Sequence, residues 1–345
     1  MIGEADMPEP DMPEPDMPEP NKRPDWWLVE VPADEDDTRI DRFLRRLVPG
    51  LTQGPVEKML RSGLIRLDGA KAKPATRLVA GQQLRLPPHL RDAPVAETAA
   101  RPVTARPVTA TPQLRRQFAE MVVAEGADWI AINKPSGLAV QGGSGMTRHV
   151  DSMLQALAEG ADDRMRLVHR IDKDTSGLLL LARDRAAARR LTRAFQAQEM
   201  EKTYLALVAG APPAALEIKE KLLKAAGGSG EMMMVSADGQ TAHSQMRRVE
   251  TAGRKLAMAA LRPRTGRTHQ LRVHMAHAGH PIIGDGKYGG SAAHPGGGIA
   301  KKLHLHAWRL RLPDGIEIEA PLSAHFQQSL DLLGLAVPGT DWQFA

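Results

Sequence analysis

The 345-residue sequence predicts an α+β protein with a small N-terminal domain and a larger C-terminal domain. From about residue 118, strand-like apolar runs and amphipathic helical patterns follow one another with Gly-rich turns between them. Over residues 38–88, two short helical patterns precede two strand-like runs. Residues 89–117 separate these regions and contain ARPVT twice in tandem, as in an extended linker. We therefore expect the larger domain at residues 118–333 and a C-terminal tail at residues 334–345.

The first 37 residues are predicted to form a disordered acidic tail that ends in a strand leading into the small domain. DMPEP occurs three times over residues 6–20, and such a composition cannot form a hydrophobic core. Residues 1–37 hold thirteen acidic residues against two basic ones. Two interpretations stay open. Either the acidity screens the rest of the chain from non-specific RNA contacts, or the tail is a low-complexity leader without a function of its own.

The small domain begins with the helical pattern TRIDRFLRRLVPG, which Pro49 ends. VEKMLRSG follows as a second short helix, with Gly63 as its C-terminal cap. Two strand-like pieces, LIRLDG and QQLRLPP, are expected to be joined by a turn at Asp68 and Gly69. These elements predict a compact unit of two helices and a hairpin.

Beyond its acidic tail, the chain is strongly basic. Residues 38–345 carry 44 basic residues against 28 acidic ones. Such a surplus usually indicates an anionic partner, most commonly nucleic acid, and a charge that only maintains solubility is the alternative. Six outward basic residues of the small domain are expected to contact a phosphate backbone: Arg39, Arg42, Arg46, Lys58, Arg61 and Arg66.

The larger domain opens with MVVAEGADWIAINKP, which has the pattern of a β-hairpin. LLLLAR is predicted to be a buried strand, and DRAAARRLTRAFQAQE an amphipathic helix with Asp184 as its N-cap. KTYLALVAG and LAMAALRPR indicate further strands. Because the sequence has no cysteine and no apolar run long enough for a membrane span, we expect a protein of the reducing cytosol.

Two acids, Asp172 and Asp174, lie in HRIDKDTSG, directly before the leucine run. Taken alone, DKDT has the Asp-x-Asp-x-Thr form of aspartate-dependent phosphatases, in which the first acid attacks phosphorus. That loop follows a strongly hydrophobic parallel strand, whereas here His169 and Arg170 precede the acids. The cations beside the acids also disfavour a magnesium site. The phosphatase interpretation is therefore weak.

Four histidines are crowded in RTGRTHQLRVHMAHAGH, which raises the question of a metal site. His274 and His277 have the i, i+3 spacing of one helix face. The HExxH pattern is absent, however, and Arg267 and Arg272 would repel a dication. We therefore expect no metal ion and histidines that form structural hydrogen bonds.

Taken together, these stretches resemble the Rlu-type ribosomal RNA pseudouridine synthases over nearly all of residues 30–330. The resemblance rests on INKPSGLAVQGGSG, LVHRIDKDTSGLLLLAR, EKTYLALV, RPRTGRTHQLRVHMAHAGHPIIGDGKYG, LHLHAWRL and EAPL. Residues 38–88 are similar, through RIDRFL, KMLRSGLIRLDG and AGQQLRLPP, to the RNA-binding domain named after small-subunit ribosomal protein S-four. VQGGSG and LLK resemble the RluC-type subgroup, which modifies several uridines of large-subunit ribosomal RNA. The implied fold of the larger domain is a mixed, largely antiparallel sheet flanked by helices.

The resemblance implies a reaction that detaches uracil from its ribose and rejoins it through carbon. Asp172 corresponds to the family's nucleophile, and whether it attacks the sugar or the base stays open. Arg267 is implied to pair with Asp172, with an ordinary phosphate contact as the alternative. Asp174 is expected only to shape the turn.

The same resemblance assigns three further residues to the substrate. Tyr204 is expected to pack against a target base that has left the stack, and Leu271 to supply an apolar wall. Arg170 is expected to fill the gap that the flipped base leaves, or to contact a phosphate. Tyr288 and the KPSG turn are expected to be structural.

The function implied is isomerisation of specific uridines in large-subunit ribosomal RNA by a cytoplasmic, monomeric enzyme. No cofactor or metal is needed, because the substrate supplies both bond partners. The alternative is a non-catalytic ribosome-assembly factor that keeps the fold and only binds RNA. The set of Asp172, Tyr204 and Arg267 favours the enzyme.

Overall fold

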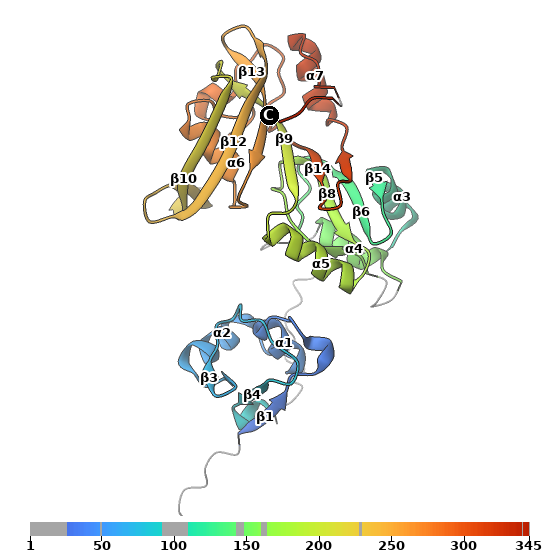
Figure 1. Ribbon diagram of the computed structural model, residues 1–345, viewed down its shortest axis with the longest axis vertical. Coiled ribbons are helices and arrows are strands. Elements are labelled where there is room, and N and C mark those ends of the chain that lie inside the picture. The colour runs from blue at the N-terminus through green and yellow to red at the C-terminus, as the bar shows by residue number, and fades with distance from the viewer. Residues whose placement is uncertain are drawn as a thin grey trace, which may run out of the picture. The chain divides into compact units, whose positions relative to one another are not determined.

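The structure, a computed structural model, describes residues 26–48, 50–91, 110–142, 148–159, 164–227, 230–339 and 341–344. The chain divides into two compact units, Met1–Thr104 and Ala105–Ala345 (Figure 1). The DMPEP and ARPVT repeats lie outside the described residues. The disorder of the acidic tail and the extended form of the linker therefore stay predictions.

The smaller unit packs two helices on a four-stranded sheet. The helices are α1 (Ile40–Leu47) and α2 (Gln53–Ser62), with short 3-10 turns at Ala33–Glu35 and Pro88–Leu90. The strands, in spatial order, are β1 (Trp27–Glu30), β4 (Gln83–Leu86), β2 (Arg66–Leu67) and β3 (Ala70–Lys71). Apolar side chains from the helices and strands, among them Ile40, Leu60 and Leu84, form one buried core.

Two details of this unit compare directly with the sequence analysis. Gly63 ends α2 in the left-handed conformation, which confirms the expected cap. The turn at Asp68 and Gly69 joins β2 to β3, so the expectation that it leads directly to QQLRLPP is wrong. The reason is local: the Asp68 carboxylate accepts the Gln83 amide at 2.8 Å, which holds the short β2–β3 turn against the start of β4.

The larger unit is built on an eleven-stranded sheet. Its path runs β11-β10-β12-β13-β9-β14-β8-β6-β5, with β15 paired to β14 and β7 paired to β8. The strands are β5 (Val122–Glu125), β6 (Trp129–Lys134), β7 (Arg166–Leu167), β8 (Ser176–Ala182), β9 (Glu201–Ala209), β10 (Ala215–Gly227), β11 (Gly230–Val235), β12 (Gln240–Ala252), β13 (Leu256–Pro263), β14 (Leu305–Arg311) and β15 (Glu317–Glu319). Over the described residues, these strand pairs are antiparallel except for β8 and β14. The mixed, largely antiparallel sheet is therefore confirmed.

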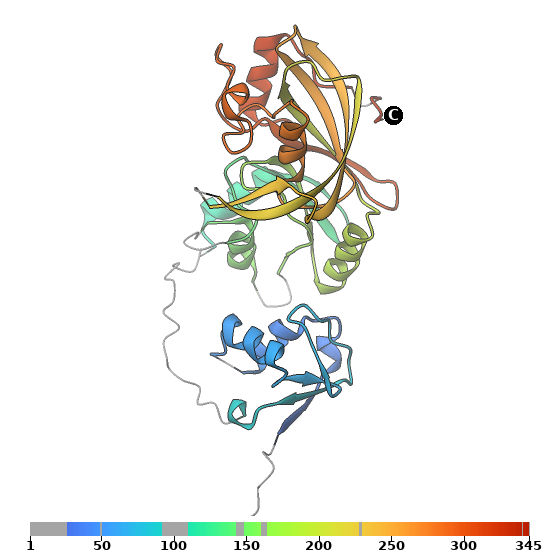
Figure 2. The ribbon, with the colours of Figure 1, turned by 90° about the vertical axis from the view of Figure 1, so that its left-hand side faces the viewer.

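Helices flank this sheet, as expected. They are α3 (Pro112–Met121), α4 (Val150–Leu157), α5 (Arg185–Gln196), α6 (Gln270–His277) and α7 (Ala324–Leu333), with a 3-10 turn at Gly290–Ala293. Helix α6 lies against the long strands β10, β12 and β13 (Figure 1 and Figure 2). The side chain of Asp184 accepts a hydrogen bond from the Ala187 amide at 2.8 Å, which confirms it as the N-cap of α5.

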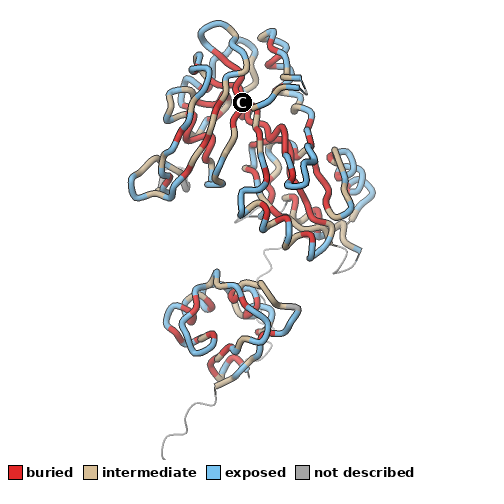
Figure 3. Tube along the Cα trace, in the orientation of Figure 1, coloured by how far each residue is buried: buried red, intermediate tan, exposed pale blue. Residues whose placement is uncertain are grey.

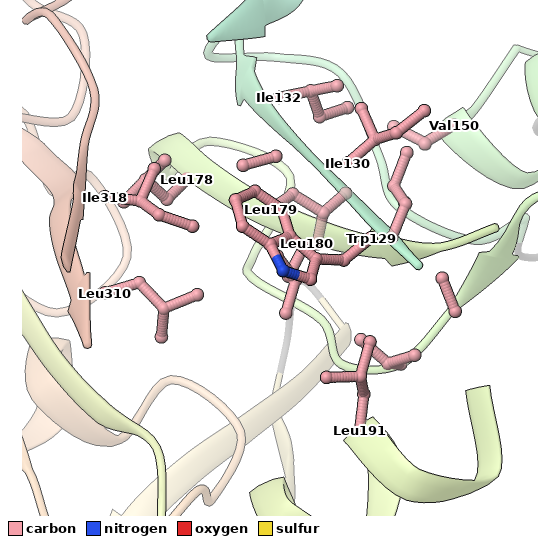
Figure 4. Close-up of a cluster of buried hydrophobic side chains, with 14 of the residues drawn as sticks. Trp129, Ile130, Ile132, Val150, Leu178, Leu179, Leu180, Leu191, Leu310 and Ile318 are labelled. Atoms are coloured by element: carbon pink, nitrogen blue, oxygen red, sulfur yellow. The ribbon is translucent and has the colours of Figure 1, made fainter. Parts of the chain in front are cut away.

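The centre of the larger unit is a hydrophobic core on both sides of β8. Every residue of this strand is buried, and Leu179, Leu180 and Leu181 have no exposed surface. Figure 3 shows the buried stretches along the central strands of the sheet. Figure 4 shows how the leucines pack with Trp129 of β6 and Leu191 of α5. This core fixes the position of β8, and hence of the loop that precedes it.

The end of the chain also packs on the larger unit. The Arg309 guanidinium donates to the carbonyls of Gly339 and Trp342, both at 2.8 Å. The rings of Trp308 and Trp342 have centroids 6.0 Å apart. In the part of the chain that the structure describes, no helix is long and apolar enough to cross a membrane.

Candidate active site

Five residues singled out in the sequence line one pocket of the larger unit. This pocket has a volume of about 520 Å³, and its walls come from the loop before β8, from α5, from β9 and from the turn between β13 and α6. The five residues are Arg170, Asp172, Tyr204, Arg267 and Leu271. The fold thus brings together segments that are far apart in the sequence.

The KPSG turn fixes the loop that carries Asp172. Lys134, at the end of β6, has no exposed surface, and its ammonium group donates to the carbonyls of Leu138 and Lys173 at 2.8 and 3.0 Å. Burial lowers the pKa of Lys134 to about 7, against the opposing effect of the Asp174 carboxylate. The Ser136 hydroxyl donates to the Asp174 carbonyl at 2.8 Å. The residues that directly follow Asp172 are therefore held by backbone hydrogen bonds to this turn.

Two histidines anchor the ends of the same loop. His169 Nε2 accepts the Leu180 amide at 2.8 Å, and its ring stacks on Phe195 with centroids 4.2 Å apart. Burial lowers the pKa of His169 to about 3, so the ring is neutral near pH 7 and able to accept this bond. At the other end, the Ser176 hydroxyl lies 2.9 Å from Nδ1 of His306 on β14. The backbone around Asp172 is thus fixed before any substrate binds.

Asp172 faces an arginine that a second, buried carboxylate holds in place. Nη1 of Arg272 lies 4.0 Å from Oδ2 of Asp172. Nε and Nη2 of Arg272 donate to the two oxygens of Asp285 at 2.8 and 2.7 Å. The Asp285 side chain is 1% exposed, whereas that of Asp172 is 21% exposed and borders the pocket. Such a two-pronged pair fixes the direction of the guanidinium.

The expected partner of Asp172 therefore needs correction. The structure brings Arg272 to Asp172, and not Arg267. Arg267 is exposed in the loop before α6, and its Nε donates to the Thr241 carbonyl at 3.1 Å. Arg272 lies within α6, among buried residues, and this helix turns its guanidinium towards Asp172.

Arg272 and Asp285 are the site residues that the sequence analysis missed. A signal was available, since Arg272 lies in an otherwise buried helical pattern, and a buried arginine requires a carboxylate partner. The acid in GDGKYG is such a partner close in the sequence, and it is Asp285. Without that partner, Arg272 is recognisable from the sequence only as a charge that repels metal ions.

Tyr204 and Leu271 form the apolar side of the pocket. Tyr204 lies on β9, where it packs with the hydrophobic cluster that contains Leu271. Burial, together with the negative charge of Asp172, raises the pKa of Tyr204, so its hydroxyl stays neutral. The ring remains partly exposed towards the pocket. A flat side chain beside a carboxylate suits the binding of a planar, polar ring.

The crowded histidines form separate hydrogen bonds in place of a joint metal site. Nδ1 of His274 lies 2.9 Å from the Ser244 hydroxyl, and burial lowers its pKa to about 4. Nδ1 of His269 lies 2.6 Å from the hydroxyl of Tyr288, which also accepts the Met233 amide at 3.1 Å. Among the described residues, no group of three or more His, Cys, Asp or Glu could hold a metal ion.

In the smaller unit, the six expected phosphate contacts divide into two kinds. The side chains of Arg39 and Arg46 are paired with Asp41 and Glu35, and Arg66 donates to the carbonyls of Gly63 and Gly69. Arg42, Lys58 and Arg61 are exposed and form no ion pair within the residues that the structure describes. The second group presents its charge to solvent without first breaking a pair.

The geometry of the larger unit defines what its pocket can bind. The pocket combines a carboxylate, an oriented cation, an aromatic ring and an apolar wall. Arg170 and Arg267 are exposed members of its lining. An anionic substrate with a flat, hydrogen-bonding ring matches this set, as a nucleotide does.

Comparison with known proteins agrees with this reading. Residues 128–277 match the RNA pseudouridylate synthase family. The chain is 36% identical over 320 residues to ribosomal large subunit pseudouridine synthase C of Salmonella typhi, covering 89% of this chain and 96% of the relative. It is 35% identical over 299 residues to the protein of that name from Rickettsia bellii, covering 84% and 96%.

A solved structure shares the fold. The human RNA pseudouridylate synthase domain containing 4 protein aligns with a TM-score of 0.54 at 24% identity, covering 66% of this chain and 98% of that one. The similarity to the relatives extends over nearly their whole length and includes the loop that presents Asp172. The chain therefore belongs to the RNA pseudouridylate synthase family and is an isomerase.

Proposed function

We propose that this enzyme converts specific uridines of large-subunit ribosomal RNA to pseudouridine, with Asp172 as the nucleophile. The observation that carries this proposal is the position of Asp172, which lies on a fixed loop in the pocket and faces Arg272. The relatives with 35–36% identity are named for large-subunit ribosomal RNA, which supports the choice of substrate.

The reaction balances without an added reactant. The bond between N1 of uracil and C1′ of ribose breaks, and a bond between C5 and C1′ forms. The proton on C5 leaves, and N1 takes up a proton from solvent, so that the product is an isomer of the substrate. Because the product is an isomer of the substrate and no redox change occurs, the reaction consumes no co-reactant.

Asp172 acts in one of two ways in this scheme. In the first, its carboxylate bonds to C1′ while the electrons of the C1′–N1 bond leave with uracil; the base then rotates and C5 displaces the carboxylate. In the second, the carboxylate adds to C6 of the base before the glycosidic bond breaks. Both routes turn the charged carboxylate into a neutral ester and back. Arg272 remains compensated by Asp285 while this happens.

The other pocket residues are assigned to the flipped nucleotide. Tyr204 packs against the uracil ring, and Leu271 supplies an apolar wall beside it. Arg170 takes the space that the nucleotide leaves in the RNA, because it lies in the same loop, two residues before Asp172, and is exposed. Arg267 contacts a phosphate, consistent with its exposure and its backbone-bound guanidinium.

The smaller unit is proposed to bind the same RNA away from the reaction centre. Arg42, Lys58 and Arg61 contact phosphates, and Arg39, Arg46 and Arg66 contribute once RNA competes with their present partners. We further propose that the enzyme works as a monomer in the cytoplasm.

The direct test is to map pseudouridines in ribosomal RNA from cells with and without this gene. The proposal predicts that particular uridines of the large-subunit RNA stay unmodified without the gene, and that the wild-type gene restores them. Unchanged pseudouridine positions together with defective ribosome assembly would instead identify a non-catalytic assembly factor.

A further inference from the structure

Helix α5 carries a row of basic and polar side chains that leads away from the pocket. Arg185, Arg189 and Arg193 follow one another at four-residue spacing, which places them along one side of the helix. Thr192 and Gln196 continue the same side, since each lies three residues from one of these arginines. The name α5 stripe is used here for these five residues.

The other side of α5 is committed to the core. Ala187, Leu191 and Ala194 are buried there, and Leu191 packs near the leucines of β8 (Figure 4). The helix therefore has a fixed orientation, with the α5 stripe turned to the outside. Arg185 and Arg193 are exposed, and their side chains form no ion pair within the described part of the chain.

The α5 stripe is continuous with the site of reaction. Thr192 and Gln196 both line the pocket that contains Asp172, as does Phe195. Arg193 is next to Thr192 in the chain and three residues from Gln196. Arg193 comes eight positions after Arg185, or about 12 Å along the helix axis. An RNA strand that leaves the pocket along α5 would therefore meet Arg193 and Arg185, which form no ion pair with any residue that the structure describes.

We infer that the α5 stripe binds the phosphate backbone of the RNA strand that flanks the target uridine. Two exposed arginines on one side of the helix, Arg185 and Arg193, with the half-buried Arg189 between them, match a polyanion and give little apolar surface for a folded protein partner. A nucleotide that enters the pocket must be joined to backbone that passes over its edge, and α5 forms part of that edge. This inference rests on the proposed function and adds to it a second phosphate-binding surface, distinct from the smaller unit.

The inference predicts a specific change in salt dependence. Each phosphate contact contributes about 0.7 to 0.9 to the slope of log affinity against log salt concentration. Loss of Arg185 and Arg193 together should therefore flatten this slope by about 1.4 to 1.8. At low salt, kcat/KM should fall on the order of tenfold. The fall should come from a higher KM, because neither side chain touches the reacting atoms.

The test compares Arg185→Gln/Arg193→Gln with the wild type, using an unmodified large-subunit ribosomal RNA transcript labelled with tritium at C5 of uridine. Tritium release reports turnover, because C5 loses its hydrogen when it bonds to C1′. The control away from the pocket is Arg254→Gln, which removes one positive charge, since Arg254 is exposed in the turn between β12 and β13, at the end of β13 opposite the pocket. Arg185→Lys/Arg193→Lys keeps both charges and should leave the slope unchanged.

Each outcome is decisive for the α5 stripe. The inference is supported if log kcat/KM falls less steeply with log salt concentration for the Gln pair than for the wild type, while the slopes for the Lys pair and for Arg254→Gln are unchanged. Parallel slopes for the Gln pair and the wild type, or an equal change in Arg254→Gln, overturn it. If the wild type releases no tritium, the proposed function fails instead. The salt dependence of binding to the same transcript, measured in an Asp172→Asn background, then decides the role of the α5 stripe.

Discussion

The guanidinium of Arg272 lies 4.0 Å from the carboxylate of Asp172 and is held there by Asp285. One cation thus faces two carboxylates, of which one is buried and fixes its direction, and the other borders the pocket. A nucleophilic carboxylate loses its charge when it forms an ester. In the proposed reaction, Asp285 would keep Arg272 neutralised and in place during that step, so that the Asp172 carboxylate returns to the same partner afterwards.

Replacing Arg272 with lysine should damage turnover far more than RNA binding. Lysine keeps the charge but cannot form two parallel hydrogen bonds to Asp285, so its ammonium group is not directed at Asp172. We expect kcat to fall by about a hundredfold or more, as for other misplaced catalytic groups, and RNA affinity to stay within a few-fold. Tritium release at saturating RNA and filter binding of the same RNA measure the two effects.

The matched change on the other side of this pair is Asp285→Asn. It leaves a buried arginine without its charged partner, which should lower the free energy of unfolding by about 3–5 kcal/mol. Urea unfolding measures this loss, and the kcat defect should resemble that of Arg272→Lys. A loss of RNA affinity alone, with unchanged kcat in both variants, would contradict the role given to Arg272.

Arg267→Gln should weaken RNA binding more than it slows turnover. Because Arg267 is exposed and its guanidinium is bound to a backbone carbonyl, it has no contact through which to act on Asp172. We expect KM for RNA to rise by about three- to tenfold, as for a single phosphate contact, with little change in kcat. A fall in kcat comparable to that of Arg272→Lys would restore the pairing implied by the resemblance.

Four histidines should make the fold less stable in acid. Burial lowers the pKa of His169 to about 3 and the pKa of His274, His304 and His306 to about 4. In the unfolded chain these groups titrate near 6.5, so below about pH 6.5 the unfolded state binds protons that the folded state does not. Stability is therefore full above pH 6.5 and falls as the pH drops towards 4.

Each fully protonated histidine of the unfolded state contributes up to about 1.4 kcal/mol per pH unit to this loss. Urea unfolding between about pH 7 and pH 5 measures the slope. His274→Asn keeps a polar group near the Ser244 hydroxyl but does not titrate, so its slope should be shallower than that of the wild type. Equal stability at both ends of this pH range would show that these rings accept protons in the folded state.

Local features of the fold were predictable because they depend on neighbouring residues. The cap at Asp184 and the end of α2 at Gly63 follow from single residues at helix boundaries. The order of strands does not follow from such signals. Strand β14 comes from near the end of the chain and inserts between β9 and β8, parallel to β8, and local periodicity carries no information on that pairing.

The candidate site also combines features that local sequence predicts with one that depends on the three-dimensional arrangement. The five residues that line the pocket could be predicted from the sequence because each lies in a recognisable segment. The identity of the arginine beside Asp172 depends instead on where α6 begins. Since the helix starts at Gln270, Arg267 stays in the preceding loop and Arg272 is turned inwards. The sequence places both arginines in one basic stretch, and only the three-dimensional arrangement distinguishes them.

The central claim is that Asp172, and not its neighbour Asp174, is the nucleophile. The most direct measurement is tritium release from C5-labelled large-subunit ribosomal RNA by Asp172→Asn and by Asp174→Asn. Asp172→Asn should lose at least about a thousandfold in kcat while binding the RNA within a few-fold of the wild type, because only the reacting oxygen is replaced. Asp174→Asn should stay within a few-fold of the wild type, since Asp174 interacts with Ser136 through its carbonyl. Near-wild-type turnover by Asp172→Asn would contradict the account.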